Sequence, residues 1–184
     1  MKNGNGFIDD KYFKGEIKNG EINGKVKEYG YDGRLIFEGE YLNGKRNGKG
    51  KEYFRNGNIK FEGDYLNGKR WNGKGYNIKK ELLYELNNGK GYVKEYNDLN
   101  NKLIFEGEYL NGEKNGKGKE YDYDGKLIFE GEYLNGKRNG KGKKYYYNGK
   151  LKFEGEYLNG KRNGKAKEYD YKGKLLLLKN EKNL

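Results

Sequence analysis

Apolar and charged residues alternate in short stretches along this chain, and each stretch ends at a pair of turn residues. In residues 37–51, the letters FEGEYL precede Asn43-Gly44 and KRNGKGK follows. Alternation with a period of two is typical of β-strands, because successive side chains of a strand point to opposite faces. Asn-Gly favours a two-residue hairpin turn, which needs a positive φ at both positions. The pattern therefore predicts a β-hairpin in residues 37–51.

The same hairpin pattern recurs along nearly the whole chain. Six copies open with a phenylalanine, with gaps of 24, 24, 44, 24 and 24 residues between them: Phe13, Phe37, Phe61, Phe105, Phe129 and Phe153. The long gap holds a divergent copy with Ile78 in the phenylalanine position, and the shortened copy before it contains Trp71, which we expect to fill space at the junction. We therefore count seven copies, which begin at residues 13, 37, 61, 78, 105, 129 and 153. A second turn, such as Asp32-Gly33, closes each copy.

Hairpins that follow one another in this way predict an all-β fold. We expect an elongated single-layer antiparallel β-sheet of about seven stacked β-hairpin repeats, because each hairpin is marginal alone and is stabilised by its neighbours. The repeat array is predicted for residues 13–176. Residues 1–12 are expected to form an N-terminal cap or flexible tail, and residues 177–184 a C-terminal tail.

The turn at residues 43–44 sets the predicted register of each hairpin. Continued without interruption, it gives these cross-strand pairs: Leu42 with Lys45, Tyr41 with Arg46, Gly39 with Gly48, Glu38 with Lys49, and Phe37 with Gly50. One face then carries the aromatic rings with glycines beneath them, an arrangement that stabilises sheets. The opposite face carries the lysines and glutamates. Near the second turn the pattern conflicts with this register, since Tyr53 would lie on the charged face and Glu52 beside Phe61. Either a β-bulge resets the pleat or the charged face has a small apolar strip of its own.

Composition narrows the chemistry. The chain has 184 residues, a formal net charge of +12, 37% charged residues and 32% hydrophobic residues. It contains no Cys, His, Pro, Ser, Thr or Gln, so disulfides, thiol chemistry, the usual nucleophiles and the commonest acid–base group are absent, although Asp, Glu, Lys and Tyr could still do chemistry. We expect no enzymatic activity, no catalytic residues, no cofactor and no metal site. The first ten residues lack an apolar signal segment, and the longest apolar run is Leu175–Leu178, which predicts a cytoplasmic protein.

The repeat resembles the MORN (membrane occupation and recognition nexus) repeat. The motif aromatic-x-Gly-x-aromatic-x-x-Gly-x-x-x-Gly-x-Gly is matched by Phe37, Gly39, Tyr41, Gly44, Gly48 and Gly50, and again by Phe129, Gly131, Tyr133, Gly136, Gly140 and Gly142. The spacing is most similar to a MORN variant found in antitoxin-like proteins. The chain departs from the family pattern with Tyr instead of Trp at the second aromatic position, with Ile17 and Leu82 there in two copies, and with Ala166 for the last glycine. The resemblance implies a non-catalytic scaffold that binds partner proteins or helical segments along its aromatic groove, often as a dimer and often near membranes or the cytoskeleton.

Two surfaces are candidates for binding. The first is the aromatic face, which we expect to bind a helical or extended protein segment, unless its rings serve only to cover the glycines: Phe37, Tyr41, Phe61, Tyr65, Phe105, Tyr109, Phe129, Tyr133, Phe153 and Tyr157. The second is a Lys-Arg edge after the hairpin tips, which could bind an acidic membrane surface or acidic partner: Lys45, Arg46, Lys69, Arg70, Lys137, Arg138, Lys161 and Arg162. The alternative is that these cations only keep exposed strands soluble.

Other partners are weighed from the same features. Nucleic acid is not expected as a partner, because Glu113-Lys114 interrupts the basic edge. Self-association into dimers or filaments is a third hypothesis, because a ribbon has two open edge strands. A location at the periphery of a membrane or of the cytoskeleton is an extension of the cytoplasmic prediction. An antitoxin role has the least support.

Overall fold

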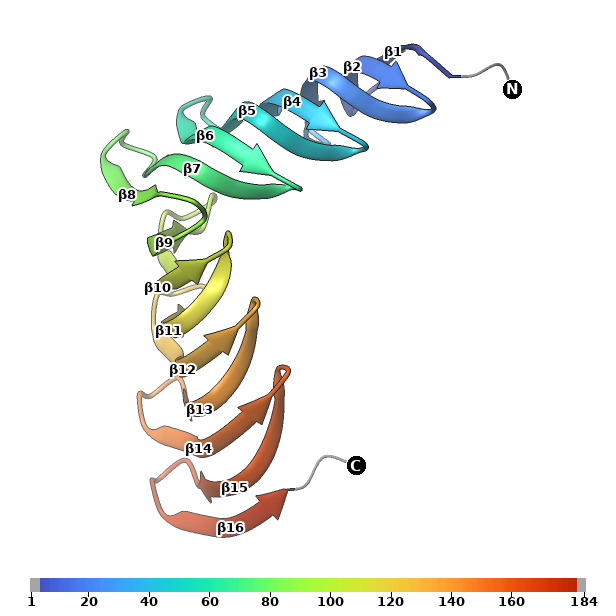
Figure 1. Ribbon diagram of the computed structural model, residues 1–184. Helices are drawn as coiled ribbons and strands as arrows, with labels where there is room; N and C mark the ends of the chain where they lie inside the picture. The colour runs from blue at the N-terminus through green and yellow to red at the C-terminus, as the bar shows by residue number, and fades with distance from the viewer. Residues whose placement is uncertain (1–3, 182–184) are drawn as a thin grey trace. The chain divides into compact units, whose positions relative to one another are not determined.

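The computed structural model describes residues 4–181, which form sixteen β-strands and no helix. The strands are β1 (Gly6–Asp9), β2 (Phe13–Lys18), β3 (Glu21–Tyr29), β4 (Leu35–Leu42), β5 (Lys45–Tyr53), β6 (Ile59–Leu66), β7 (Lys69–Tyr76), β8 (Leu82–Leu86), β9 (Gly91–Tyr96), β10 (Leu103–Leu110), β11 (Glu113–Tyr121), β12 (Leu127–Leu134), β13 (Lys137–Tyr145), β14 (Leu151–Leu158), β15 (Lys161–Tyr169) and β16 (Leu175–Glu181). All pair antiparallel with sequence neighbours (Figure 1). The predicted all-β hairpin fold is confirmed. Nothing within residues 4–181 is a helix that could cross a membrane.

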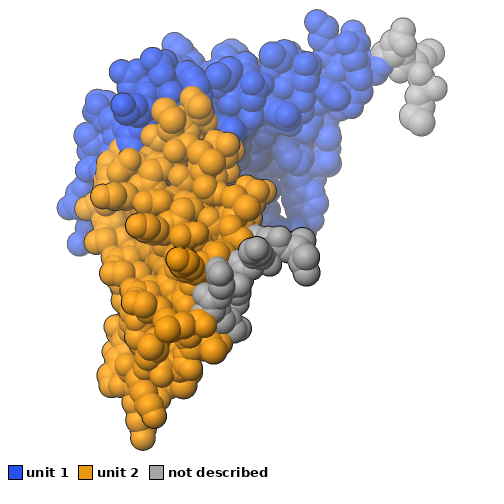
Figure 2. Space-filling view, turned by 60° about the horizontal axis from the view of Figure 1, so that its bottom comes forward, with its two compact units in different colours: residues 1–91 blue, residues 92–184 orange. Residues whose placement is uncertain are grey.

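The hairpins form two open sheets rather than one continuous sheet. Strands β1–β8 make the first sheet and strands β9–β16 the second, each in chain order. The chain divides accordingly into two compact units, residues 1–91 and 92–184, which Figure 2 distinguishes by colour. Each sheet carries its own set of buried aromatic rings.

The hairpin turns follow the predicted chemistry. Asn43 has a φ of 50° and Gly44 a φ of 71°, as a type I′ turn requires. The second kind of turn is held by an aspartate or asparagine side chain. At residues 122–126, Asp122 Oδ1 accepts hydrogen bonds of 2.9 Å from the backbone N–H groups of Asp124 and Lys126. Local sequence therefore fixes both turns of a copy.

The predicted register is wrong beyond the first two pairs of each hairpin. Leu42 pairs with Lys45 and Tyr41 with Arg46, as expected, but these pairs follow: Gly39 with Gly50, Glu38 with Lys51, and Phe37 with Glu52. The shift is a β-bulge at Gly48, whose φ of 92° is a left-handed conformation that favours glycine. The bulge shifts the pairing by two residues. As a result, Glu52 joins the aromatic face.

A second bulge lies where the sequence left two alternatives open. The register between β5 and β6 shifts between Glu52 and Tyr53, so the pleat is reset before the turn. The Tyr53 hydroxyl also donates a hydrogen bond to Glu38 on the charged face. The first alternative, a β-bulge, is therefore observed.

The divergent copies depart from the predicted alignment. Ile78 lies in a turn between β7 and β8 and takes no part in a strand. Tyr84 of β8 instead takes the phenylalanine position: it is buried and stacks on Phe61 with ring centroids 6.4 Å apart. In β7, Trp71 stands between Arg70 and Asn72, which pair with adjacent residues of β6, so this hairpin has a shorter bulge. This shorter bulge places Gly75, instead of a glutamate, opposite Phe61.

Both predicted tails contain strands. Strand β1 (Gly6–Asp9) pairs with β2 within the segment expected to be a cap or tail. Strand β16 runs to Glu181 and pairs with β15, so residues 177–181 are not a tail. In both cases the backbone hydrogen bonds of the neighbouring strand extend the array beyond the last copy that the motif identifies. Residues 182–184 of the predicted tail lie outside the described residues.

Candidate functional site

The predicted aromatic face is an interior rather than an exposed surface. The five phenylalanines that open the regular copies from residue 37 onward are at most 1% exposed. The tyrosines on this face pack edge-to-face against them. For example, the Phe37 ring lies 5.9 Å from that of Tyr41 and 5.2 Å from that of Tyr65, so each phenylalanine contacts its own and the following copy. Tyr41, Tyr65, Tyr133 and Tyr157 are buried, and Tyr109 is partly buried.

Bare glycine backbone makes this burial possible within a single layer. A Cβ placed on Gly50 would meet Phe37 Cζ at 2.6 Å and Tyr65 Cε2 at 3.1 Å. The predicted covering of glycines by aromatic rings is confirmed, although the glycine opposite Gly39 is Gly50 and not Gly48. The ten predicted aromatic residues therefore form two cores, and the expectation that they are exposed for a partner is wrong.

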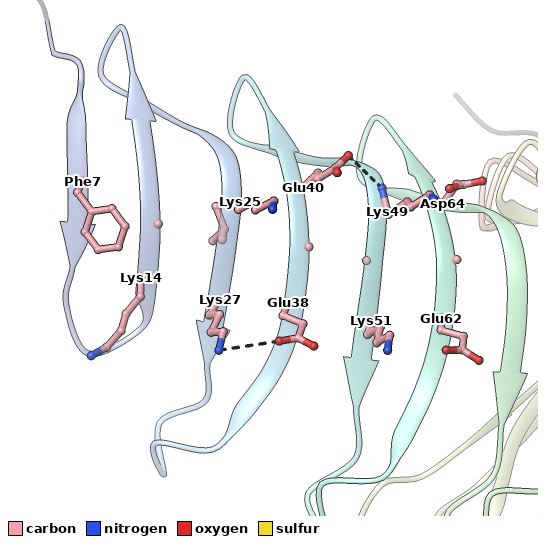
Figure 3. A pocket seen from close by; sticks show the side chains of 15 residues that line it. Phe7, Lys14, Lys25, Lys27, Glu38, Glu40, Lys49, Lys51, Glu62 and Asp64 are labelled. Atoms are coloured by element: carbon pink, nitrogen blue, oxygen red, sulfur yellow. Dashed lines mark hydrogen bonds and ion pairs between the residues drawn. The ribbon is translucent and has the colours of Figure 1, made fainter.

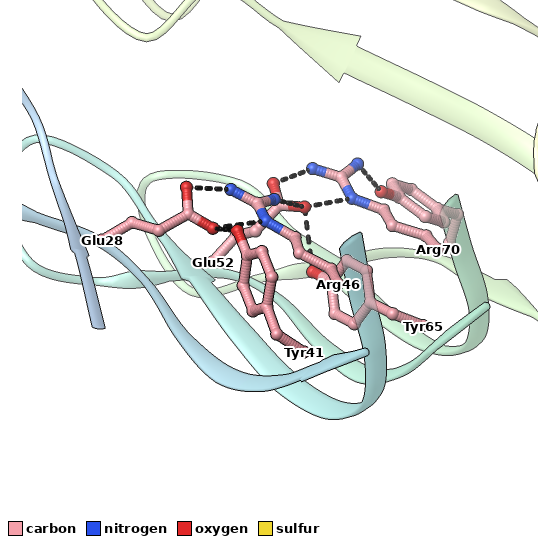
Figure 4. A network of polar contacts seen from close by, with 7 residues as sticks. Glu28, Tyr41, Arg46, Glu52, Tyr65 and Arg70 are labelled. Atoms are coloured by element: carbon pink, nitrogen blue, oxygen red, sulfur yellow. Dashed lines mark hydrogen bonds and ion pairs between the residues drawn. The ribbon is translucent and has the colours of Figure 1, made fainter. Parts of the chain in front are cut away.

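A buried layer of charges covers these rings (Figure 4). Arg46 donates from Nε and Nη2 to the two oxygens of Glu28, both at 2.9 Å, and from Nη1 to Glu52 at 3.2 Å. The Tyr41 hydroxyl donates to the same Glu28 oxygen as Nε. The Arg46 guanidinium lies 4.0 Å from the centre of the Phe37 ring, within cation–π distance. Each carboxylate thus joins a tyrosine and an arginine of the next copy.

The layer continues through the first sheet. Glu52 accepts hydrogen bonds from the Tyr65 hydroxyl at 2.8 Å and from Arg70 Nε at 3.0 Å. Arg70 also donates from Nη1 to the Tyr84 hydroxyl at 2.7 Å. Burial alone would raise the pKa of Glu52, but the charges of Arg70 and Arg46 and these hydrogen bonds lower it to about 2. Glu52 therefore stays ionised between two arginines at neutral pH.

The second sheet repeats this layer of charges, with a lysine in place of one arginine and with one position where the layer is interrupted. Glu120 accepts hydrogen bonds from Tyr133 and Arg138, and Arg138 lies 4.0 Å from the Phe129 ring centre. In the copy that starts at residue 105, Lys114 replaces the arginine and lies 3.7 Å from the Phe105 ring centre. The break lies in the last copy, at Arg162, which pairs with Glu168 of its own strand.

The arginines of the predicted Lys-Arg edge do not lie at an exposed edge of the sheet. The side chains of Arg46, Arg70, Arg138 and Arg162 are only 21–32% exposed, and each is paired with a glutamate on the aromatic face. Adjacent residues of a strand point to opposite faces, so the lysine and arginine of each pair separate. The lysines remain at the hairpin tips, where Lys45, Lys137 and Lys161 are exposed and Lys69 is partly exposed. The edge thus offers about half of the charge that the sequence suggested.

The charged face of the first sheet holds a groove with a volume of about 680 Å³. Figure 3 shows its charged side chains in two rows, one with Lys14, Lys27, Glu38, Lys51 and Glu62 and the other with Lys25, Glu40, Lys49 and Asp64. The residues between the rows are Gly15, Val26, Gly39, Gly50 and Gly63, whose backbone forms the floor. We call this feature the glycine-floored groove.

From β3 onward, carboxylates and lysines alternate from strand to strand along each wall. Glu38 pairs across the strands with Lys27 on one side and with Lys51 on the other. Phe7 of β1 lines the groove where the first sheet begins. The wall is therefore nearly neutral overall, with charges of both signs at the spacing of the strands, about 4.8 Å.

The second sheet has the same feature in two adjoining parts, of about 310 and 500 Å³, which share Lys141, Gly142 and Lys143. Leu178 of β16 lines the far part. Sequence reasoning did not identify this groove. A signal was present in the triplets Glu-Gly-Glu and Lys-Gly-Lys, because alternation places both charges of a triplet on one face and leaves only backbone between them.

These features define a class of protein: a β-hairpin repeat protein whose repeats stack an aromatic ring on cross-strand glycines. The family model of the MORN repeat matches residues 37–59, 105–126, 129–150 and 153–174. The chain is a MORN repeat protein, which confirms the resemblance seen in its motifs. A comparison with curated proteins finds no match. MORN repeats are generally associated with interactions with proteins and membranes and typically form non-enzymatic scaffolds.

Proposed function

We propose that this protein is a non-enzymatic scaffold that binds an extended segment of a partner protein in the glycine-floored groove. The observation that carries the proposal is the groove itself, which recurs on the charged face of both sheets. Its volume in the first sheet lies in the usual range of binding sites, about 300–1,000 Å³. The buried aromatic face offers no comparable surface.

The chemistry of the groove indicates the kind of segment. The floor is backbone without side chains, so apolar side chains of a partner could approach it closely. From β3 to β6 the walls alternate lysine with glutamate or aspartate, so a complementary segment carries charges of both signs beside an apolar line. Five lysines and four carboxylates line the groove of the first sheet. Such walls favour a peptide with both positively and negatively charged side chains over a uniformly acidic surface.

The experiment uses site-specific photo-crosslinking to capture the partner, followed by a measurement of the affinity of the captured segment for the protein and its variants. A photoreactive residue at Lys49, on the groove wall, should capture the partner, whereas one at Lys45, on a hairpin tip, should not. With the captured segment as a synthetic peptide, the double variant Lys49→Glu/Lys51→Glu should bind at least tenfold more weakly, because it reverses two wall charges. The matched tip variant Lys45→Glu/Lys137→Glu should change the affinity less than twofold.

The opposite pattern rejects the groove. If the tip variant loses affinity and the wall variant does not, the partner binds the hairpin tips. Co-sedimentation with vesicles that contain anionic lipid tests the membrane alternative, and salt-sensitive binding abolished by Lys137→Glu/Lys161→Glu would favour it. We rank the membrane alternative second because the arginines of the edge are paired inside the sheet.

We also propose self-association through β16, on a separate observation. Leu175, Leu176, Leu177 and Leu178 are 40–68% exposed on a strand at the edge of the second sheet. An exposed apolar edge strand pairs readily with another strand. Sedimentation velocity should show association that increases with concentration, and Leu176→Lys/Leu178→Lys should abolish it. A wild-type protein that stays monomeric at every concentration would reject this proposal.

A further inference from the structure

Among the described residues, the same set of side chains around a carboxylate occurs three times on the aromatic face. In each, a glutamate accepts hydrogen bonds from a tyrosine 13 residues later and from an arginine 18 residues later. The three sets are Glu28 with Tyr41 and Arg46, Glu52 with Tyr65 and Arg70, and Glu120 with Tyr133 and Arg138. Arginine Nε and the tyrosine hydroxyl donate to one oxygen, and Nη2 donates to the other. A guanidinium that donates two parallel bonds is a strong and specific partner for a carboxylate.

A fourth position has the same tyrosine and arginine but no carboxylate. At the glutamate position stands Lys144, with Tyr157 and Arg162 at the same spacings of 13 and 18 residues. Lys144 lies in the glutamate register, paired with Phe129 on one side and Phe153 on the other. Here the sequence reads KGKKYYYNG where the preceding copy reads KGKEYDYDG. One substitution has thus replaced the internal anion with a cation.

The remaining groups of this position are left without their usual partner. Tyr157 is only 5% exposed, and within the described part of the chain its hydroxyl has no hydrogen-bond acceptor, although the Arg162 guanidinium, a donor, lies near it. Arg162 keeps the bond from Nη1 to Glu168, which corresponds to the bond from Arg46 Nη1 to Glu52. Among the residues whose side chains the structure describes, no carboxylate is bonded to its Nε or Nη2. A buried hydroxyl without a partner destabilises the fold, so the position favours a ligand that restores the bond.

Several positive charges surround the orphaned hydroxyl. Burial lowers the pKa of Lys144, and the charges of Arg138, Arg162 and Lys152 lower it further. The same two arginines act on Tyr157, where burial raises the pKa and their charges oppose the rise. Arg138 is neutralised by Glu120, but among the described side chains no carboxylate bridges Arg138 and Arg162 as Glu52 bridges Arg46 and Arg70. The local field therefore favours an anion.

We propose that Lys144, Tyr157 and Arg162 form a binding site for a carboxylate group that another molecule supplies. The carboxylate takes the place that Glu28, Glu52 and Glu120 occupy in the other sets. One oxygen accepts from the Tyr157 hydroxyl and Arg162 Nε, and the other accepts from Nη2. The side chain of Lys144 is partly exposed, so its ammonium group can contact an anion that enters from solvent. Two sources share this chemistry: a free small carboxylate and an acidic side chain of a bound protein.

The test measures thermal unfolding of the full chain in sodium acetate and in sodium chloride at equal ionic strength and neutral pH. Acetate should raise the wild-type midpoint by about 2–4 °C at a concentration several times Kd, with saturation. In Lys144→Glu the restored internal carboxylate should raise the midpoint in chloride and remove the response to acetate. An equal acetate response in the two proteins would overturn the proposal.

A second variant separates ligand binding from folding. Tyr157→Phe removes only the unpartnered hydroxyl, so it should keep or raise the midpoint in chloride and weaken the acetate response. The matched control Tyr133→Phe removes a hydroxyl bonded to Glu120 and should lower the midpoint while the acetate response persists. If Tyr157→Phe responds to acetate as strongly as the wild type, the site is wrong.

A peptide titration identifies the source of the carboxylate. A short capped peptide with one glutamate is compared with acetate and with the same peptide carrying glutamine. Binding of the glutamate peptide at least tenfold tighter than acetate assigns the site to an acidic side chain of a protein, and equal affinity assigns it to small carboxylates. Binding that is the same for the glutamate and glutamine peptides, together with no acetate response, would overturn the proposal.

Discussion

At the scale of single residues, the stability of this protein depends on glycines that lie beneath rings. Gly142 lies under Phe129 of its own copy and Tyr157 of the next, and a Cβ there would meet Phe129 Cζ at 2.7 Å and Tyr157 Cε2 at 3.2 Å. Ala166 occupies the same position in the last copy. No tyrosine follows it at the same spacing, since Glu181 stands there. The methyl group at Ala166 therefore has one ring fewer to displace, whereas in the first copy Val26 holds this position although Tyr41 follows it at the same spacing.

This comparison gives a prediction for Gly142→Ala. The added methyl must displace two rings, so the free energy of unfolding should fall by about 1–3 kcal/mol. Ala166→Gly, the reverse change at the equivalent position, should alter it by less than about 1 kcal/mol. Urea denaturation of both variants measures the difference. Similar losses in the two would show that ring packing is not the cause.

Glu52 gives a prediction on pH. Its pKa is about 2 in the folded protein and has an ordinary value of 4.5 in the unfolded chain. Its ion pairs therefore contribute stability that is fully present above pH 4.5 and lost as the pH falls towards 2. The contribution is roughly 3 kcal/mol. Urea denaturation between pH 2 and 6 should show a smaller loss of stability in Glu52→Gln, which is less stable at pH 6 but does not titrate. Parallel curves would contradict this assignment.

At the scale of the structural element, a repeat is a hairpin with a bulge in its second strand. In the copy that starts at residue 129, Gly140 has a φ of 91°, and the next backbone N–H, that of Lys141, donates a 3.0 Å hydrogen bond to Glu132. The bulge shifts the pairing, so that a charged residue faces the rings. The inward layer of charges exists because of this one feature.

Gly140→Ala should therefore cost more than an alanine at an ordinary turn glycine. Its Cβ would overlap the Glu132 carboxylate and break the bond to Lys141, in addition to the left-handed strain of about 1–2 kcal/mol. Gly149 has a similar φ of 79° with open space around it, so Gly149→Ala should lose only the free energy of the left-handed strain. Chemical denaturation should find a difference of about 1 kcal/mol between them. Equal losses would mean that Glu132 does not hold the bulge.

At the scale of the whole molecule, the array consists of two sheets that pair their strands separately. Stacked repeats are stabilised by their neighbours, so stability is nearly a sum of adjacent contacts. Strands β9–β16 contain a complete aromatic ladder, with Phe105, Phe129 and Phe153 each at most 1% exposed. The second sheet thus has its own core.

A fragment of residues 92–184 should fold by itself. It should keep the β-sheet signal in far-ultraviolet circular dichroism and the tyrosine signal in the near ultraviolet, and it should unfold cooperatively in urea. A shorter fragment that begins at residue 118, within β11, loses the Phe105 layer and should be less stable. A 92–184 fragment without near-ultraviolet signal would show that the second sheet needs the first.

Sequence alone determined the repeat, the hairpins, their turns and the covering of glycines by rings, because these depend on period-two alternation and on Asn-Gly conformations that are local properties. It did not determine the register beyond Tyr41, since the extra residues at Gly48 are visible only when the strands are paired. For the same reason it placed the arginines at an edge and the aromatic rings on an open surface. Only the tertiary structure decided that Glu52 pairs with two arginines from different copies, that Lys144 interrupts this layer, and that the open groove lies on the charged face. The physical reason is that each of these contacts joins strands whose relative position is set by bulges, and a bulge changes which residues meet without changing the motif.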